Sequence, residues 1–269
     1  MLRFSGVALS HVGLVRSGNE DSGFMGPTCM LVADGVGGAA AGEVASATAA
    51  YVVSAMSMAE AETDPFALLR SGVRLAQQQI NVGVLRDPAR DGMATTLSAI
   101  ATDGERFALA HVGDSRGYLF RDDTLTRVTH DHTVVQRLVD EGSLDERDVP
   151  YHPWRSVVTR SVNGALTEVG DLTELHLVAG DRVLLASDGL TDLVPEPDIE
   201  RILGEHHDDA AAEALVEAAL AAGGRDNVTV LLASVIEGQP VHADGVLVGA
   251  VRDPRNVVDA AAVRIPHSA

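Results

Sequence analysis

Strand-like segments recur along the whole chain as short runs in which apolar residues alternate with polar ones or follow one another directly. These segments lie at residues 3–16, 28–33, 95–129, 182–186 and 225–235. The longest contains turn signals at Asp103-Gly104 and Asp122-Asp123, and turns at such short intervals are typical of antiparallel strands that form a meander. The pattern therefore predicts antiparallel β-sheet.

Between these segments the apolar positions recur every three to four residues, which is the spacing of one face of a helix. The expected helices lie at 39–59, 65–86, 133–141 and, as an alanine-rich pair, 197–222. Pro65 suits the first turn of its helix because its missing N–H would have no intrahelical partner there. Residues 142–169 are polar and weakly periodic, and a long irregular insert of this kind is usually functional or mobile.

Aspartates stand where several of the predicted strands end. Asp34 follows the apolar run in "MLVADGVGG", Asp114 follows residues 107–112, and Asp188 follows residues 182–186, whereas Asp226 stands at the start of the last strand. Any one of them suits ordinary turn chemistry. In an antiparallel sheet the start of one strand lies beside the end of its neighbour, so all four can reach one edge. Together they predict an acidic pocket.

Composition narrows the possible functions. The chain has 269 residues, 46% of them hydrophobic, which is ample for a core, and its formal net charge of -19 opposes binding to nucleic acid or to an anionic membrane surface. All 20 basic residues are arginine, so the lysine of a phosphate-binding P-loop and the catalytic lysine of a protein kinase are both excluded. Phosphoryl transfer from a nucleotide by those two routes is therefore excluded.

Several features favour a soluble, cytoplasmic protein. A single cysteine, Cys29, excludes an internal disulfide and is expected to be a packed core thiol. The N-terminus lacks the pattern of a cleaved signal peptide, and no apolar run approaches the roughly 20 residues that span a bilayer. Residues 238–269 lie beyond the last predicted strand and are interpreted as a C-terminal tail, an appendage of unknown role to a domain at 1–237.

Converging carboxylates have a chemical use. Ionised aspartates a few ångströms apart repel one another, and a bound divalent cation removes the conflict. Ligation by carboxylate, carbonyl and water oxygens favours Mg²⁺ or Mn²⁺, whereas zinc prefers histidine or cysteine. Gly35, directly after Asp34, would let its backbone carbonyl reach an ion without a Cβ in the way. The sequence thus predicts a Mg²⁺ or Mn²⁺ site.

Seven short motifs in one order resemble the metal-dependent protein phosphatase family, the type 2C serine/threonine phosphatases, over about residues 4–236. The motifs are "RSGNED" from Arg16, "VADGVGG" around Asp34, "GMATTL" from Gly92, "HVGDSRGYL" from His111, "THDH" from Thr129, "ASDGLTD" from Ala186 and "RDNVTV" from Arg225. The resemblance implies an α+β fold, in which an antiparallel β-sandwich is flanked by helices on both outer faces. It also implies two Mn²⁺ or Mg²⁺ ions at one end of the sandwich.

Carried over residue by residue, the resemblance makes Asp34 the ligand that bridges two metal ions. The Gly35 carbonyl would bind one ion, and Asp188 and Asp226 the other. Arg16 matches the phosphate-binding arginine, which suits a guanidinium because it can grip two phosphate oxygens at once. The alternative for Arg16 is a solvated surface charge.

Further positions carry weaker implications. Glu20 matches an acid that holds water at the metal ions, and Asp21, Asp192 and Asn227 are expected to surround the metal ligands without binding metal themselves. Asp114 matches a ligand of a third metal ion in bacterial relatives, and Ser156 aligns loosely with that ion's second contributor. A purely structural role, in which Asp114 caps a turn and pairs with Arg116, stays open.

The implied reaction is direct hydrolysis of phosphoserine and phosphothreonine by a water that bridges the two ions, with Arg16 neutralising phosphoryl charge. One departure concerns Val36, which stands where some eukaryotic members have a histidine able to protonate the leaving group. Other histidines, such as His111 and His132, are expected to be packed or hydrogen-bonded. The expected partners are phosphoproteins, including a serine/threonine kinase. The rival interpretations are a catalytically silent, phosphoprotein-binding domain and a protein in which a cation only stabilises the fold.

Overall fold

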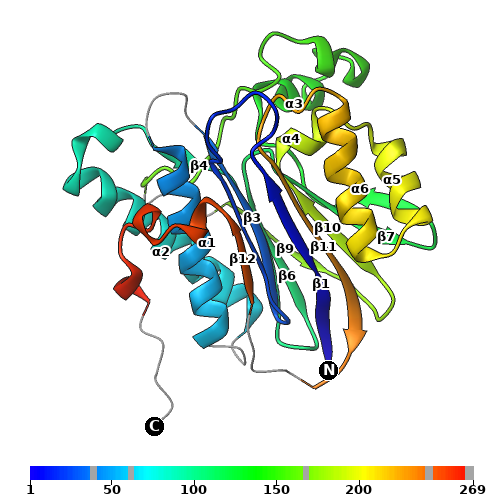
Figure 1. Ribbon diagram of the computed structural model, residues 1–269, viewed down its shortest axis with the longest axis horizontal. Coiled ribbons are helices and arrows are strands. Elements are labelled where there is room, and N and C mark those ends of the chain that lie inside the picture. Colours follow the sequence, from blue (N-terminus) through cyan, green and yellow to red (C-terminus); the bar gives the residue numbers. More distant parts are fainter. Residues whose placement is uncertain (37–40, 60–63, 166–169, 240–244, 264–269) are drawn as a thin grey trace.

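The computed structural model describes residues 1–36, 41–59, 64–165, 170–239 and 245–263. Two antiparallel sheets pack face to face, with one pair of helices on the outer face of each sheet (Figure 1). The expected α+β class, an antiparallel β-sandwich flanked by helices on both sides, is confirmed. Among the described helices we find none whose length and apolar content would let it cross a lipid bilayer.

The first sheet has the strand order β1-β11-β10-β7-β8. Its strands are β1 (Leu2–His11), β11 (Val228–Glu237), β10 (Arg182–Ala186), β7 (Arg116–Arg121) and β8 (Thr124–Arg127). Each neighbouring pair is antiparallel, so the chain's first strand lies along its last long one, with Leu2 opposite Glu237 and His11 opposite Val228. The ends of β10 and β1 and the start of β11 therefore meet at one edge of the sheet, as the sequence predicted.

The second sheet has the order β12-β2-β3-β5-β6-β9, and β4 pairs with the end of β3. Its strands are β12 (Val246–Gly249), β2 (Asp21–Met25), β3 (Cys29–Val36), β4 (Ala94–Thr95), β5 (Leu97–Thr102), β6 (Phe107–Val112) and β9 (Asp171–Leu175). β5 and β6 are buried along their whole length, because the sandwich covers one face and helices cover the other. That double burial explains why they read as continuous apolar runs.

The four large helices lie where the periodicity predicts them. They are α1 (Gly42–Ala59), α2 (Pro65–Arg86), α5 (Glu196–Glu205) and α6 (Asp208–Ala221), and residues 39–40 of the first prediction lie outside the described residues. α1 and α2 pack on the second sheet, and α5 and α6 on the first. A third apolar cluster, including Phe4, Met30 and Val183, fills the space between the sheets. Cys29 is fully buried under α1 and α2, and its pKa rises to about 12, so it is an inert core thiol.

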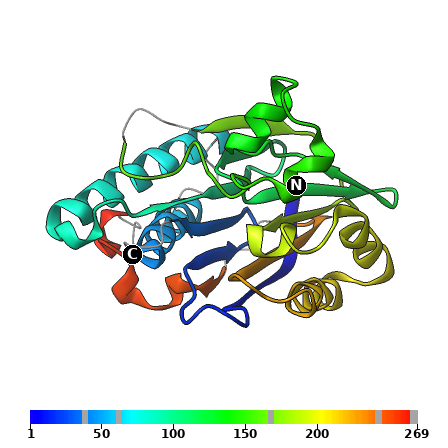
Figure 2. The ribbon, with the colours of Figure 1, turned by 90° about the horizontal axis from the view of Figure 1, so that it is seen from above.

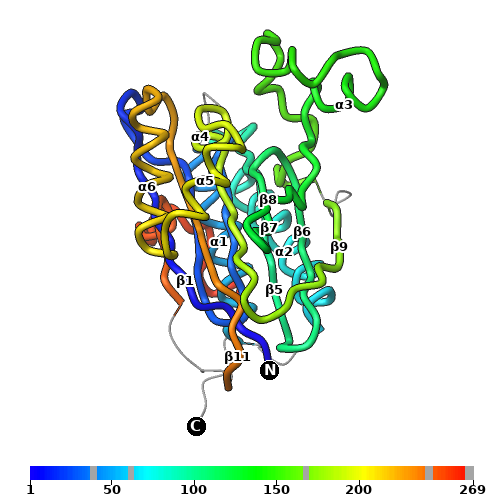
Figure 3. Tube along the Cα trace, turned by 90° about the vertical axis from the view of Figure 1, so that its right-hand side faces the viewer, coloured from blue at the N-terminus to red at the C-terminus, as the bar shows by residue number. Residues whose placement is uncertain are grey.

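The segment after β8 projects beyond the ends of the sheets (Figure 3). It begins with α3 (Val134–Asp140) and continues through a short 3-10 helix, η2 (Glu146–Tyr151). An isolated bridge between Thr133 and Val158 closes this segment on itself, and one between Thr95 of β4 and Val162 ties it back to the sandwich. The insert predicted at 142–169 has little regular structure apart from η2, and β9 begins after it at Asp171. Its residues 166–169 lie outside the described residues.

The C-terminal segment differs from the expectation of an appendage. β12 pairs with β2, from Val246 opposite Met25 to Gly249 opposite Ser22, and three 3-10 turns follow it, η3 (Ala250–Arg252), η4 (Pro254–Asn256) and η5 (Ala260–Ala262). Ala250 and Val251 are buried, and in Figure 2 the turns lie beside α1 and α2. Residues 245–263 therefore belong to the packed body of the fold, whereas 240–244 and 264–269 lie outside the described residues. The role of the segment stays a prediction.

Candidate active site

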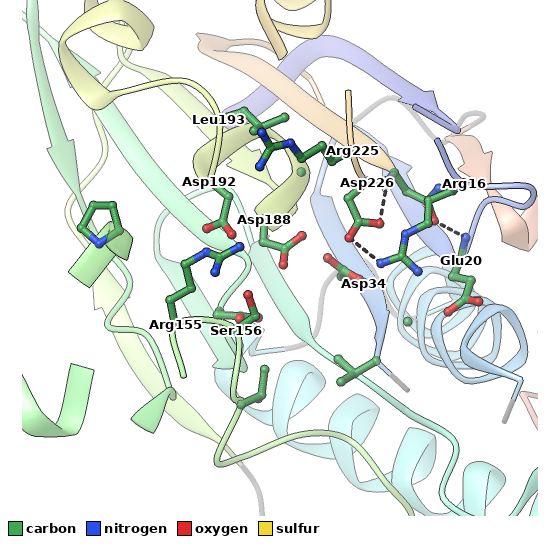
Figure 4. Close-up of a pocket in the computed structure, with 17 residues that line it drawn as sticks. Arg16, Glu20, Asp34, Arg155, Ser156, Asp188, Asp192, Leu193, Arg225 and Asp226 are labelled. Carbon is green, nitrogen blue, oxygen red and sulfur yellow. Dashed lines mark hydrogen bonds and ion pairs between the residues drawn. The ribbon is translucent and has the colours of Figure 1, made fainter. Parts of the chain in front are cut away.

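The predicted acids meet in a pocket at the end of the sandwich. Asp34 lies near the end of β3, Asp114 in the turn between β6 and β7, Asp188 at the start of the short helix α4 (Asp188–Thr191), and Asp226 just before β11. All four line one cavity of about 570 Å³ (Figure 4). Further predicted residues line the same cavity: Arg16, Glu20, Gly35, Ser156, Asp192 and Asn227. Antiparallel pairing thus brings residues from distant parts of the chain to one edge.

The backbone of Asp34 is held by two threonines of the "GMATTL" motif. The Asp34 N–H donates to Thr96 Oγ1 at 2.9 Å, while Thr95 Oγ1 and the Thr96 N–H donate to the Asp34 carbonyl, each at 2.8 Å. Gly35 has a second reason to be glycine, because a Cβ there would lie 2.6 Å from the carbonyl group of Gly42. The sequence predicted the glycine for metal access and missed this close approach of β3 to α1.

Asp21 lies directly opposite Asp34 in the pairing of β2 with β3 and is only 1% exposed. Ser187 Oγ donates to Asp21 Oδ2 at 2.8 Å, whereas Oδ1 is buried without a hydrogen-bond partner among the described residues. Burial raises the pKa of Asp21 to about 6. A buried carboxylate oxygen without a partner is rare. The carboxyl group of Asp21 also has other acids, Asp34 and Asp226, in its surroundings. Asp21 therefore lies beside Asp34 without lining the pocket, and its role around the metal ligands stays a prediction.

The carboxyl groups of Asp34 and Asp188 have pKa values well above the usual range. The largest cause in both is desolvation by the surrounding protein, and the next is repulsion from neighbouring aspartates, including Asp21 and Asp114. The pKa of Asp114 is raised to about 7, first by burial and then by Asp131 and Asp192. The protein therefore holds these acids together at an electrostatic cost, and a bound cation would offset it.

Arg16 and Glu20 are carried by the loop between β1 and β2. Asn227 organises this loop, because its side-chain Nδ2 donates to the carbonyls of Val12 and Gly18, both at 2.9 Å, and its Oδ1 accepts from the Glu20 N–H at 2.7 Å. Arg16 Nη2 donates to Asp226 Oδ2 at 2.6 Å, and about half of the Arg16 side chain remains exposed. Arg16 is therefore anchored at the edge of the acidic cluster.

Arg116 does not pair with Asp114. Its guanidinium binds Asp131, with Nη2 2.8 Å and Nε 3.0 Å from Oδ2. Asp114 and Ser156 instead both line the pocket, the first from the turn between β6 and β7 and the second from the insert. The structure thus removes the ion pair on which the purely structural alternative for Asp114 partly rested.

The sequence analysis missed some residues that line the pocket, among them Arg155, Arg225, Leu193 and Val158. Arg155 and Arg225 are direct neighbours in sequence of two predicted site residues, Ser156 and Asp226, which is the one signal that could have indicated them. Within the described residues, no three side chains of the His, Cys, Asp or Glu types already surround a single point at metal-binding spacing. The acids share a pocket but do not form a closed cage.

Residues 21–222 match the family model described as Protein phosphatase 2C. The chain is 43% identical over 251 residues to the serine/threonine protein phosphatase PstP of Mycobacterium tuberculosis, covering 93% of this chain and 48% of that protein. It is 33% identical to the serine/threonine phosphatase stp of Listeria welshimeri, covering 82% of this chain and 91% of that protein. The chain thus spans about half the length of the Mycobacterium relative.

Solved structures agree with these matches. A crystal structure of the Mycobacterium tuberculosis phosphatase PstP/Ppp matches with a TM-score of 0.83 and 42% identity, covering 87% of this chain and 100% of that one. The catalytic domain of PstP, solved in complex with 2 manganese ions, matches with a TM-score of 0.80 and 41% identity, covering 88% of this chain and all of that one. The predicted family resemblance and fold are confirmed.

Proposed function

The chain belongs to the protein phosphatase 2C family, and from this premise we propose that it hydrolyses phosphoserine and phosphothreonine in proteins with two Mn²⁺ or Mg²⁺ ions. The observation that carries the proposal is the arrangement of Asp34, Asp188 and Asp226 around one pocket, with Arg16 bonded to its rim. A protein in which a cation served only stability would have no use for an exposed arginine at that place.

The donor atoms of the pocket fit these ions. Carboxylate oxygens from Asp34, Asp188 and Asp226, with the Gly35 carbonyl, form a set of oxygen ligands, which Mg²⁺ and Mn²⁺ prefer. Asp21, with its unpartnered buried oxygen behind Asp34, adds negative charge without lining the pocket. Bound there, the ions would lower the pKa of water to make it a nucleophile and would offset the charge of the phosphoryl group. Asp114 and Ser156 are proposed as contributors to a third, weaker site.

The chain's own residues would position the substrate. The Arg16 guanidinium presents several N–H donors in one plane, and its hydrogen bond to Asp226 leaves others for the oxygens of a phosphoryl group. Asn227 keeps Arg16 and Glu20 in place through the loop that it organises. Glu20 lines the pocket and is proposed to orient the attacking water.

No histidine is among the described residues that line the pocket. His111, on β6, is buried and its pKa is lowered to about 4, so it is neutral at physiological pH and cannot serve as the acid for the leaving alkoxide. With Val36 in place of the histidine of some relatives, we propose that none of the described pocket side chains is the acid, and that ions held by Asp34, Asp188 and Asp226 would supply an acidic water for this role. The packed role predicted for His111 agrees with this position.

The proposal extends to cellular context. A net charge of -19 supports phosphoprotein substrates over nucleic acid, because long-range repulsion opposes binding to a phosphate backbone. A serine/threonine kinase is a natural partner for an enzyme that reverses such phosphorylation, and we place both in the cytoplasm.

The test is turnover of a phosphothreonine peptide before and after metal removal. We expect activity to vanish in chelator, to return with Mn²⁺, and to fall by several orders of magnitude in Asp34→Asn, because that change removes ligand charge from the ions that activate water. Asp209→Asn, an exposed position on α6, is the matched control. Binding of the peptide without turnover in Mn²⁺ would instead support a catalytically silent domain, and metal-independent turnover would contradict the mechanism.

A further inference from the structure

Two arginines of the pocket remain without a carboxylate partner. Most other arginines that the structure describes are bound to acids, such as Arg116 to Asp131 and Arg121 to Asp181, and Arg16 is bound to Asp226. Arg155 and Arg225 also line the pocket, yet the described residues give neither side chain a hydrogen bond or an ion pair. Both are exposed and line the pocket, so a bound substrate could reach them.

Arg155 lies across the pocket from Arg16. Figure 4 shows its guanidinium directed toward Asp188 and Asp192, with Asp34 and Asp226 between it and Arg16. It comes from the insert, whereas Arg16 comes from the loop between β1 and β2. A group held at the central acids would therefore have one arginine on each side of it.

The insert that carries Arg155 and the loop that carries Arg16 both expose large apolar side chains. On the insert, Tyr151 and Trp154 are 87% and 57% exposed, and Trp154 is the only tryptophan of the chain. On the opposite loop, Leu14 and Val15 are 65% and 70% exposed beside Arg16. Exposed large apolar side chains on both sides of a charged pocket suit a polypeptide better than a small phosphate ester.

We propose that Arg155, assisted by Arg225, binds a second anionic group of the substrate, a phosphate or carboxylate that flanks the phosphorylated residue being hydrolysed. This inference rests on the proposed function and specifies its substrate class. The surplus of acids in the pocket and the charge of -19 would otherwise repel such a group. A guanidinium without a partner can offer two parallel N–H donors to either anion.

The competing interpretation is that Arg155 only balances the charge of Asp192. Its charge does lower the pKa of Asp192, although burial outweighs that effect and leaves the pKa raised. A residue with only this role would affect every substrate equally. A subsite for an anion would instead affect the ratio of kcat/KM between substrates that differ in one charge.

The experiment uses the full chain with Mn²⁺ and three phosphothreonine peptides that differ at one flanking position. That position carries glutamine, glutamate or a phosphonate analogue of phosphothreonine that cannot be hydrolysed. We expect the anionic peptides to exceed the glutamine peptide in kcat/KM by about tenfold, a typical effect of one well-placed charge pair. A larger preference for the phosphonate than for glutamate identifies a second phosphorylated residue as the source, and the reverse identifies an acidic one.

Arg155→Gln should reduce that ratio to about one, and Arg155→Lys should retain part of it, since lysine keeps the charge but not the paired donors. Arg225→Gln should reduce it less. Arg74→Gln, an exposed arginine on α2 outside the pocket, should leave the ratio unchanged. Raising the ionic strength should lower the ratio in the wild type, because salt screens exposed charges.

The proposal is overturned if the wild type hydrolyses all three peptides with equal kcat/KM, or if Arg155→Gln lowers all three by the same factor. In both cases the proposed phosphatase function would stand. A wild-type protein that hydrolyses none of the peptides in Mn²⁺ contradicts the proposed function and this inference together.

Discussion

Replacing His111 with glutamine should make the stability of the protein less sensitive to acid. His111 is 2% exposed, its Nδ1 lies 2.9 Å from Ser98 Oγ, and its Nε2 lies 3.0 Å from the His130 carbonyl. Because a carbonyl only accepts, Nε2 carries a proton, and the lowered pKa of His111, about 4, keeps the ring neutral at pH 7. The His132 ring packs against it, with centroids 4.9 Å apart.

The magnitude follows from the pKa of His111, which is lowered from 6.5 to about 4, mainly by burial and then by His132, against smaller opposing effects of Asp131 and Asp171. The folded protein binds this proton more weakly than the unfolded chain does. The contribution of the neutral, buried His111 ring to the free energy of unfolding is therefore fully present above about pH 6.5 and is lost as pH falls toward 4. At about 1.36 kcal/mol per pKa unit, the loss amounts to roughly 3 kcal/mol.

The assay is urea unfolding in chelator from pH 7.5 to 4.5, with wild type, His111→Gln and the exposed control His207→Gln. At neutral pH we expect His111→Gln to be less stable than wild type, because it loses ring packing. As the pH falls, the difference in free energy of unfolding between wild type and His111→Gln should shrink or reverse, with a total change of up to about 3 kcal/mol. The control should follow the wild type. The buried aspartates titrate in all three proteins, so the difference isolates His111. Parallel curves for wild type and His111→Gln would refute the reasoning.

Three further variants test other parts of this account. Arg16→Ala should raise KM or lower kcat for phosphopeptides. Steady-state kinetics identical to wild type would favour the alternative that Arg16 is only a solvated surface charge. Asp114→Asn should stabilise the metal-free protein, because burial raises the pKa of Asp114 to about 7 and its ionised form is disfavoured in the fold. The same variant should bind less Mn²⁺ at saturating concentration, and calorimetry that gives an unchanged stoichiometry would eliminate the third site. Deleting residues 238–269 should lower Tm, because it uncovers β2, yet the folded protein should keep activity; an unaltered Tm would contradict the packing of β12.

The central acids could be predicted because they depend on short-range patterns. Asp34 and Asp188 each follow an apolar run that forms a strand, and Asp226 precedes one. In an antiparallel pair the end of one strand always lies beside the start of the next. The spacing of apolar residues and the turn signals were therefore enough to place these aspartates at one edge. The helices at 42–59 and 65–86 were likewise indicated by local periodicity.

Features that depend on contacts between distant residues could not be predicted. β12 is a four-residue edge strand that needs β2 as a template, and nothing in its short apolar run distinguishes it from a tail. Asn227 was expected near the metal ligands, but its bonds to the backbone of residues 12–20 arise only once β1 and β11 are paired. The position of Arg155 at the pocket depends on how an irregular insert folds back onto the sandwich, and the spacing of apolar residues carries no information about the conformation of such an insert.

Asp21 shows how the fold and the site depend on each other. Its position opposite Asp34 follows from the register of β2 with β3, and that register is set by the buried apolar residues of both strands. A one-residue slip would turn every side chain of β2 to the other face, so the packing of the sandwich also fixes a carboxyl group behind the pocket. Ser187, the residue before Asp188, donates to that same carboxyl group from the other sheet. Asp34 and Asp188 are therefore held in relation to each other through Asp21, a buried acid whose backbone pairs with Asp34 and whose carboxyl group accepts from Ser187. The packing of the two sheets that fixes this arrangement also buries Asp21 and so raises its pKa.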